Sequence, residues 1–265
     1  MTDPIRFEPI DLPPPPAARP WIYGNVIASA NGIVTWQRMG PQDDPIAAIA
    51  GGDFTRPGRL ADLRLMRQLR AAADAVAFGA QTLRDQPDLI GAADDVGGEL
   101  GAALVRHRAE HGRPRVPLQI VYTESGALDL GVPMFNTPDV RVVVVTTETG
   151  AQPLRARGSE ARGVTLLVAG EIHVDSPGLV QAHERLFADH GVRHLDCEGG
   201  VVMLDALHAA GLLDELFVTV TDVQIDPSAH ESIRYITPLT AAARLIAEAS
   251  VPADPAYRFQ RWRFA

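Results

Sequence analysis

Glu198, Gly199 and Gly200 are the residues of this 265-residue chain whose types and spacing most directly suggest a ligand site. They lie between a short apolar segment, residues 192–197, and a segment whose apolar residues recur at helical spacing. Paired glycines let the backbone turn sharply and leave room where a Cβ would stand. A helix start adds unpaired N–H groups and the positive end of a dipole, so the junction predicts a phosphate or pyrophosphate site. Glu198 is then a carboxylate at the carboxyl end of a strand, where open α/β sheets bind ligands.

The same junction also has a purely structural interpretation. Glycine is common where a strand turns into a helix, and a Gly-Gly pair there needs no ligand to explain it. From these residues alone, both interpretations stay open.

A second polar segment follows an apolar, strand-like run that ends at Gly79. Thr82 offers a hydroxyl, Arg84 a guanidinium that can fork onto a phosphate, and Asp85 an acceptor for sugar hydroxyls or ring N–H groups. The alternative is a surface loop whose polar side chains face water. We expect a loop over residues 81–95 in either case.

These junctions require a framework of alternating strands and helices. Apolar, β-branched runs predict strands buried on both faces, which are typical of a covered parallel sheet. The sequence therefore predicts an α/β fold, a three-layer sandwich with a central, mostly parallel sheet flanked by helices. The expected strands are residues 21–29, 75–80, 118–123, 140–147, 164–169, 192–197, 216–221 and 257–264; helices are expected over 97–111 and 178–190 and from residues 57 and 201, and a long loop over 36–56.

Composition restricts the class of protein. The chain is 46% hydrophobic and 22% charged, with a formal net charge of −9 spread along the sequence. We therefore expect no nucleic-acid partner, which would need a basic face, and no intrachain disulfide, because Cys197 is the only cysteine. No run approaches the about 18 apolar residues of a membrane span. We expect a cytoplasmic protein with a proline-rich arm at residues 1–20 and a single domain at 21–265.

Three other features carry weaker chemistry. His107 and His111 stand four residues apart on an expected helix, but no third ligand follows at suitable spacing, so we expect no metal site. Cys197 ends an apolar strand and is expected to be a buried, inert thiol. Arginines recur over residues 56–70, mostly as a solvated helix face, and one near the sheet edge could meet an anionic ligand.

In this order, the segments resemble a known family. The chain resembles the reductase domain of the riboflavin-pathway bifunctional deaminase/reductase and its stand-alone relatives, from about residue 19 to residue 223, with a weaker similarity at 257–264. One cysteine cannot supply the ligands of the zinc-deaminase half. The motifs that carry the resemblance are Ser29-Ala30-Asn31-Gly32, Gly79-Ala80-Gln81-Thr82-Leu83-Arg84, Thr123-Glu124-Ser125-Gly126, Glu198-Gly199-Gly200 and Leu213-Asp214-Glu215-Leu216.

This resemblance implies a dihydrofolate-reductase-like fold that binds NADPH across the carboxyl ends of its strands. In the family, hydride passes to an imine-like carbon of a pyrimidine with a phosphoribosyl-derived chain, and the protein supplies position and electrostatics. Arg70, Asn31 and Glu198 match substrate-side positions, and Glu198 is the catalytic candidate. The matching cofactor positions are Ala28, Gly79, Thr82, Arg84, Asp85, Gly199, Gly200, Val201 and Val202, with the pyrophosphate on the last four.

The substrate side departs from the family. Asn31 stands where the family has an aspartate, and segment 88–95 carries three aspartates and no cation where the family often has a phosphate-binding arginine. Unpartnered carboxylates would repel a phosphate there. Two alternatives therefore stay open beside a riboflavin-pathway reductase acting on a small molecule: a pterin- or dihydrofolate-type reductase, and a non-catalytic dinucleotide-binding protein. The aromatic segment 257–264 is expected to be core or the contact of a homodimer.

Overall fold

The computed structural model describes residues 10–40, 42–95 and 97–265. These residues form two compact units. Of the described residues, unit 1 contains those within 10–11, 23–66 and 213–265, and unit 2 contains those within 12–22 and 67–212. Residues 1–9 of the predicted arm lie outside the described residues, and residues 10–20 carry no helix or strand. The division into an arm and a single domain stays a prediction.

The larger unit, unit 2, is built on a parallel sheet in the order β7-β3-β4-β5-β6. Its central strands are buried almost throughout, because the apolar, β-branched runs are covered on both faces. Cys197 of β7 and Ile120 of β4 both pair with Ala77 of β3, which makes β3 their shared neighbour. The strands are β3 (Ala75–Gly79), β4 (Leu118–Thr123), β5 (Val142–Thr146), β6 (Thr165–Val168) and β7 (His194–Cys197).

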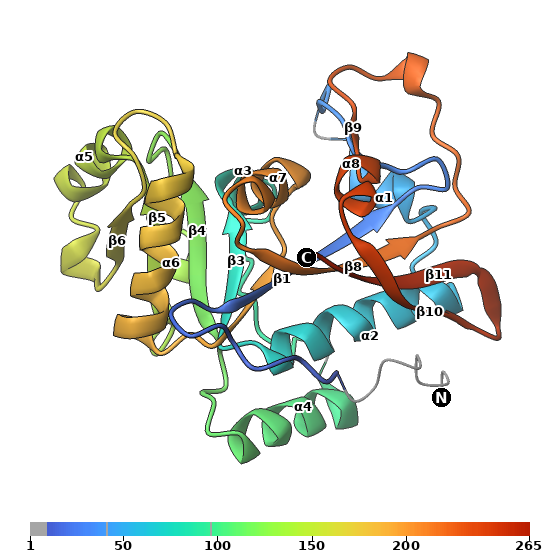
Figure 1. Ribbon diagram of the computed structural model, residues 1–265, viewed down its shortest axis with the longest axis horizontal. Coiled ribbons are helices and arrows are strands. Elements are labelled where there is room, and N and C mark those ends of the chain that lie inside the picture. Colours follow the sequence, from blue (N-terminus) through green and yellow to red (C-terminus); the bar gives the residue numbers. More distant parts are fainter. Residues whose placement is uncertain (1–9, 41, 96) are drawn as a thin grey trace. The chain divides into compact units, whose positions relative to one another are not determined.

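Helices lie between most of the consecutive parallel strands, and a 3₁₀ turn lies between β4 and β5. Figure 1 shows α5 and α6 beside β5 and β6, and both helices contact β6. The prediction of an α/β fold with a mostly parallel sheet flanked by helices is confirmed. The helices of this unit are α3 (Ala80–Asp85), α4 (Gly98–Glu110), α5 (Glu148–Ala156), α6 (Ser176–His190) and α7 (Val201–Ala209), with 3₁₀ turns at Pro133–Phe135 and Glu160–Arg162.

Unit 1 holds strands in the order β10-β11-β8-β1, with β10–β11 and β11–β8 antiparallel. Tyr257 and Phe259 of β11 are fully buried, so the aromatic segment is core at these positions. The elements are β1 (Trp21–Ala28), β8 (Leu213–Val220), β10 (Arg244–Val251) and β11 (Asp254–Arg263), a small pair β2 (Ile33–Thr35) and β9 (Arg234–Tyr235), helices α1 (Pro45–Ile49) and α8 (Thr237–Ala241), and a 3₁₀ turn at Pro227–Ala229; β1 begins in unit 2, and α2 (Pro57–Ala72) ends there.

Two expected loops contain helices, so those predictions are wrong in part. Segment 36–56 includes α1, which Asp44 caps through its side chain and which starts at a proline. Segment 81–95 begins with α3, a helix of six residues with no side-chain cap. Both helices are too short for the apolar periodicity that identifies longer ones.

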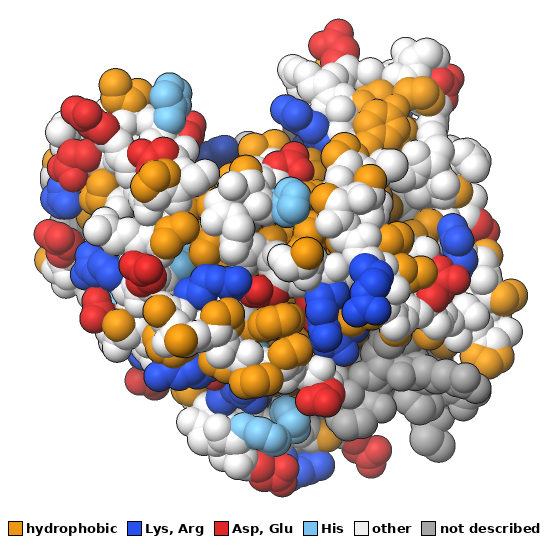
Figure 2. Space-filling view, in the orientation of Figure 1, with side chains coloured by type: hydrophobic (Ala, Val, Ile, Leu, Met, Phe, Trp, Pro, Cys, Tyr) orange, Lys and Arg blue, Asp and Glu red, His pale blue; other side chains and the backbone are white. Residues whose placement is uncertain are grey.

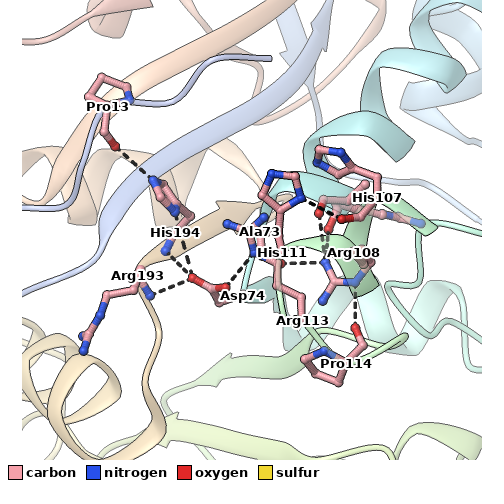
Figure 3. A network of polar contacts seen from close by, with 12 residues as sticks. Pro13, Ala73, Asp74, His107, Arg108, His111, Arg113, Pro114, Arg193 and His194 are labelled. Atoms are coloured by element: carbon pink, nitrogen blue, oxygen red, sulfur yellow. Dashed lines mark hydrogen bonds and ion pairs between the residues drawn. The ribbon is translucent and has the colours of Figure 1, made fainter. Parts of the chain in front are cut away.

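Arg108 of α4 is fully buried and holds the end of α2 in unit 2 (Figure 3). Its Nη1 donates to the carbonyls of Arg70, Ala71 and Ala73 at 2.8, 3.2 and 2.7 Å, and its Nε donates to the carbonyl of Pro114 at 2.7 Å. The last carbonyls of a helix have no partner within the helix. Arg108 therefore supplies the C-terminal cap of the helix that carries Arg70.

Replacing Arg108 with methionine should lower the free energy of unfolding by about 3 kcal/mol, because several buried carbonyls lose their donor at once. Urea denaturation measures the change. Arg106→Met is the matched control, since Arg106 is exposed on the same helix. Equal stabilities of the two variants would contradict the capping role.

His183 of α6 is fully buried and bonded at both ring nitrogens. Nδ1 lies 2.7 Å from the carbonyl of Leu179, which can only accept, so Nδ1 carries the proton. Nε2 then accepts from the hydroxyl of Tyr122 on β4, also at 2.7 Å. Burial lowers the pKa of His183 to about 4, so the folded protein holds a neutral imidazole.

This histidine predicts a loss of stability in acid. The unfolded chain binds a proton near the ordinary pKa of 6.5, whereas the folded chain does so only near 4. Stability should therefore fall by about 3 kcal/mol as the pH drops across that interval. Urea midpoints of wild type and His183→Gln measure the effect: the variant should show a flatter acid limb, and His173→Gln, at an exposed position, should not. Parallel acid limbs for wild type and His183→Gln would contradict the prediction.

Candidate functional site

The carboxyl ends of β3 and β7 carry the two glycine junctions that the sequence singled out. Gly79 is the N-cap of α3 and Gly200 the N-cap of α7, both in extended backbone that any residue adopts. Neither helix start has a side-chain cap. By contrast, the helices that follow β5 and β6 are capped by Thr147 and Asp175. The polar N–H groups at the starts of α3 and α7 are thus available to a ligand in a way that those of α5 and α6 are not.

An added Cβ distinguishes the glycines of this junction. At Gly200, as at Gly79, it would meet nothing within 4 Å. At Gly199 it would overlap Cε of Met203, which is the end of a flexible side chain and can move aside. Neither backbone conformation nor packing requires a glycine at Gly200. The turn itself therefore does not account for Gly200, and binding of a pyrophosphate at the start of α7 stays a prediction.

The two valines that open α7 have different surroundings. The side chain of Val201 is buried and that of Val202 is 62% exposed. Val201 anchors the first turn in the core, so its position and that of the neighbouring N–H groups are fixed by packing. Their role toward a cofactor stays a prediction.

The second polar segment is helical, and its polar side chains form hydrogen bonds with one another. Arg84 donates from Nη2 to Oε1 of Gln81 at 2.8 Å, and Gln81 donates from Nε2 to Asp85 at 2.9 Å. Thr82 is half-buried on the same helix. Arg84 also lines an open pocket of about 200 Å³ with Ala80, Leu83, Pro87, Leu128, Asp129 and Val132.

Arg70 and Glu198 form a buried ion pair at the end of β7. Arg70 donates from Nε to Oε1 at 2.5 Å and from Nη2 to Oε2 at 2.6 Å, and the two side chains are 4% and 10% exposed. Burial opposes the charged guanidinium, but the Glu198 carboxylate outweighs it and raises the pKa of Arg70. Two of the three residues predicted to face a substrate thus lie together, and two-pronged pairing fixes the plane of the carboxylate.

The aspartates of segment 88–95 are less repulsive than the sequence suggests. Arg115 donates to Asp94 at 2.7 Å, and Arg67 donates to Asp95 at 2.5 Å. Asp95 also lies 3.4 Å from Nη1 of Arg70. The expectation of unpartnered carboxylates is therefore wrong for these two, because arginines distant in sequence neutralise them.

The remaining predicted positions belong to unit 1. Ala28 is buried at the end of β1, and its carbonyl accepts from the N–H of Thr221 at 2.9 Å. Asn31 accepts from the Ser29 hydroxyl and donates to the carbonyl of Ile225, both at 2.8 Å. The side-chain amide of Asn31 thus stabilises a turn through hydrogen bonds. The binding roles of Ala28 and Asn31 stay predictions.

The remaining candidates, His107, His111 and Cys197, make contacts within the fold. His111 contacts the carbonyl of His107 through Nδ1 at 2.8 Å. Cys197 is buried, as expected, and burial raises the pKa of its thiol.

The described part of the chain holds no group of three or more side chains suited to a metal ion. None of its helices is long and apolar enough to cross a bilayer. Figure 2 shows acidic and basic side chains interspersed over the face in view.

One buried group was missed by sequence reasoning. Asp196 lies two residues before Glu198 in β7 and is fully buried. Its place in an apolar strand gave one signal, since a charged residue in a buried strand needs a partner.

Solved structures with known names share the fold. A pyrimidine reductase-like protein of Corynebacterium diphtheriae matches with a TM-score of 0.65 and 23% identity, over 93% of this chain and 92% of that one. The riboflavin biosynthesis reductase Rib7 of Saccharomyces cerevisiae matches with a TM-score of 0.61 and 13% identity, over 94% and 92%. RibD of Acinetobacter baumannii matches with a TM-score of 0.64 and 17% identity, and the match covers 93% of this chain but 58% of RibD. These likenesses establish the fold.

The family follows from the sequence match. No curated protein matches the chain. The family described as the RibD C-terminal domain matches residues 20–223, which is more than half of the chain and includes both glycine junctions and the Arg70–Glu198 pair. The resemblance seen in the sequence is confirmed: the chain belongs to the RibD C-terminal domain family.

Proposed function

We propose that this protein is an NADPH-dependent oxidoreductase that reduces an imine-type carbon of a small heterocycle, in the manner of 5-amino-6-(5-phosphoribosylamino)uracil reductases. The observation that carries the proposal is the junction after β7. Glu198, which forms an ion pair with Arg70, is followed directly by the start of α7. That start has no side-chain cap, and an added Cβ at Gly200 would meet no atom within 4 Å. A helix start without a side-chain cap and a carboxylate held by an arginine thus lie at the carboxyl end of one strand, where an anion and a substrate could bind.

The cofactor side is assigned to the starts of α7 and α3. The N–H groups of the first turn of α7, with Gly199 and Gly200, would hold the pyrophosphate of NADPH. Gly79 and Thr82 would approach the same ligand from α3, and Arg84 and Asp85 would exchange their bonds to Gln81 for bonds to it. Bound NADPH supplies the hydride, and the protein supplies orientation.

The substrate side is assigned to Glu198. A carboxylate has about four lone-pair sites, and Arg70 occupies two of those of Glu198. The others can accept from N–H or amino groups, which an aminopyrimidine presents. Because Arg115 and Arg67 neutralise Asp94 and Asp95, two of the three aspartates of segment 88–95 would not repel a phosphate-bearing substrate.

Turnover with a small panel tests the function. The purified chain is mixed with NADPH and an aminouracil ribosyl phosphate, a dihydropterin or a cyclic imine, and oxidation of the nicotinamide is followed by its absorbance. Turnover of the aminouracil is expected. Turnover of the pterin alone would favour a pterin-type reductase. Calorimetric binding of NADPH without turnover of any of them would favour a dinucleotide-binding protein, and no binding would overturn the proposal.

The cytoplasmic location, the homodimer and the single domain at residues 21–265 remain proposals from the sequence. Light scattering of the purified chain measures the mass in solution, and twice the mass of 28.5 kDa is expected.

A further inference from the structure

Asp196 is a buried carboxyl group without a donor. It is 0% exposed, and neither of its carboxylate oxygens receives a hydrogen bond from a donor among the described residues. Its neighbour across the sheet is Val76 of β3. An ionised carboxylate in such a place loses its hydration and gains no hydrogen bond in return.

The nearest charged groups do not supply that bond. Arg70 directs Nε and Nη2 to Glu198, and it directs Nη1 to the carbonyl of Ala92 and to Asp95. Arg70 therefore attracts Asp196 only through its charge, which the carboxylates of Glu198 and Asp95 already balance. An ionised Asp196 would add an uncompensated negative charge to this cluster.

Asp196 and Glu198 lie two positions apart on an extended segment, since the N–H of Glu198 still donates to the carbonyl of Ala77 at 2.9 Å, and side chains two apart in a strand lie on the same face. Two carboxyl groups can bond to each other only when one of them carries a proton. Of the two, Glu198 accepts hydrogen bonds from a guanidinium on both oxygens, and Asp196 accepts from none. The proton therefore belongs on Asp196.

We propose that Asp196 is a positioning residue of the reductase site, which stays protonated at neutral pH and donates its hydroxyl hydrogen to the carboxylate of Glu198. This inference rests on the proposed function for its catalytic meaning. Glu198 is then held from two sides, by Arg70 and by Asp196, and its carboxylate has one orientation to offer a substrate. The cluster of Arg70, Glu198 and Asp196 carries no net charge.

The electrostatics of the site agree with this geometry. Burial is the main cause that raises the pKa of Asp196 well above its ordinary value, and the negative charge of Glu198 adds to it, while Arg70 opposes both. The charged groups that face Asp196 are thus Glu198, next to its own strand, and Arg70 from α2, with Asp95 behind Arg70.

Two measurements test the proton without reference to activity. A protonated carboxyl has an infrared C=O band distinct from that of a carboxylate. Wild type should show such a band at neutral pH, Asp196→Asn should lack it, and Asp95→Asn, which removes an exposed carboxylate beside the same arginine, should retain it. A wild-type spectrum without a protonated carboxyl, or one that Asp196→Asn leaves unchanged, would overturn the proposal.

The stability of wild type supplies the second readout. The unfolded chain ionises Asp196 at its ordinary pKa, near 3.8, and the folded chain does not. The stabilising effect of the raised pKa is therefore complete below that value and is lost as the pH rises. The unfolding constant of wild type should increase by up to tenfold per pH unit relative to that of Asp196→Asn, until the folded group ionises. Parallel pH profiles of wild type and variant in urea denaturation would contradict a protonated Asp196.

Turnover then tests the positioning role. Asp196→Asn keeps a donor toward Glu198 and should keep NADPH affinity and most of kcat. Wild type should lose kcat at alkaline pH, where Asp196 ionises, and the variant should not. Asp196→Leu removes the donor and should lower kcat at least tenfold with NADPH affinity unchanged. Equal kcat for Asp196→Leu and wild type would refute positioning. If wild type reduces no substrate, the proposed function fails, while the infrared and stability results still decide whether Asp196 holds the proton.

Discussion

Replacing Glu198 with glutamine is expected to lower NADPH turnover by about 100-fold and the free energy of unfolding by about 3 kcal/mol, while NADPH still binds. The variant removes the charge that Arg70 clamps, so the guanidinium, 4% exposed, is left without its buried partner. Breaking a buried pair in this way costs about 3–5 kcal/mol, and misplacing a group that orients a substrate costs about 100-fold in rate. Urea denaturation, calorimetry with NADPH and initial rates measure the three quantities.

Glu215→Gln is the matched control for this experiment. Glu215 is fully buried in unit 1 and paired with Arg261 at 2.7 Å and with Arg263, so its loss disturbs a comparable ion pair. Its variant should lose a comparable amount of stability and keep the turnover per folded molecule. If Glu198→Gln behaves in the same way, Glu198 is a structural residue and its assignment to the substrate fails.

Replacing Gly200 with valine is expected to weaken NADPH binding at least tenfold with little change in stability. The backbone at Gly200 is extended and an added Cβ meets nothing within 4 Å, so the folded chain accepts the side chain. The same side chain would occupy the space assigned to the pyrophosphate and cover the first N–H groups of α7. A tenfold loss corresponds to about 1.4 kcal/mol of binding free energy, which calorimetry resolves.

Variants of two further glycines serve as comparisons for Gly200→Val. Gly40→Val adds the same side chain at another open position, in unit 1, and should alter neither binding nor stability. Gly199→Ala should change stability little, because its Cβ would displace only the flexible end of the Met203 side chain. Unchanged NADPH affinity of Gly200→Val would remove the start of α7 from the cofactor site and leave the glycine pair as a turn.

Much of the framework could be predicted because its signals are local. Strand β5 is identified by its run of β-branched residues, and helix α2 by apolar residues that recur every three positions. The short helices α1 and α3 were not predicted, because a helix of five or six residues spans too few turns to show a hydrophobic period. Strand β10 was not predicted, since its residues are mostly exposed or half-buried and its partner is the neighbouring β11. Its pairing, rather than its composition, makes it a strand.

The sequence by itself determined the family, the glycine junctions after two strands, and the residue types of the site. The tertiary structure decided which of those residues meet. Arg70 and Glu198 are separated by 128 positions, and Arg67 reaches Asp95 across 28, so no local pattern contains either pair. It also decided that Gly200 faces open space and that Asp196 is buried beside Glu198 without a donor. Charge, burial and hydrogen bonding depend on what surrounds a side chain in space, and that is fixed only when distant segments pack together.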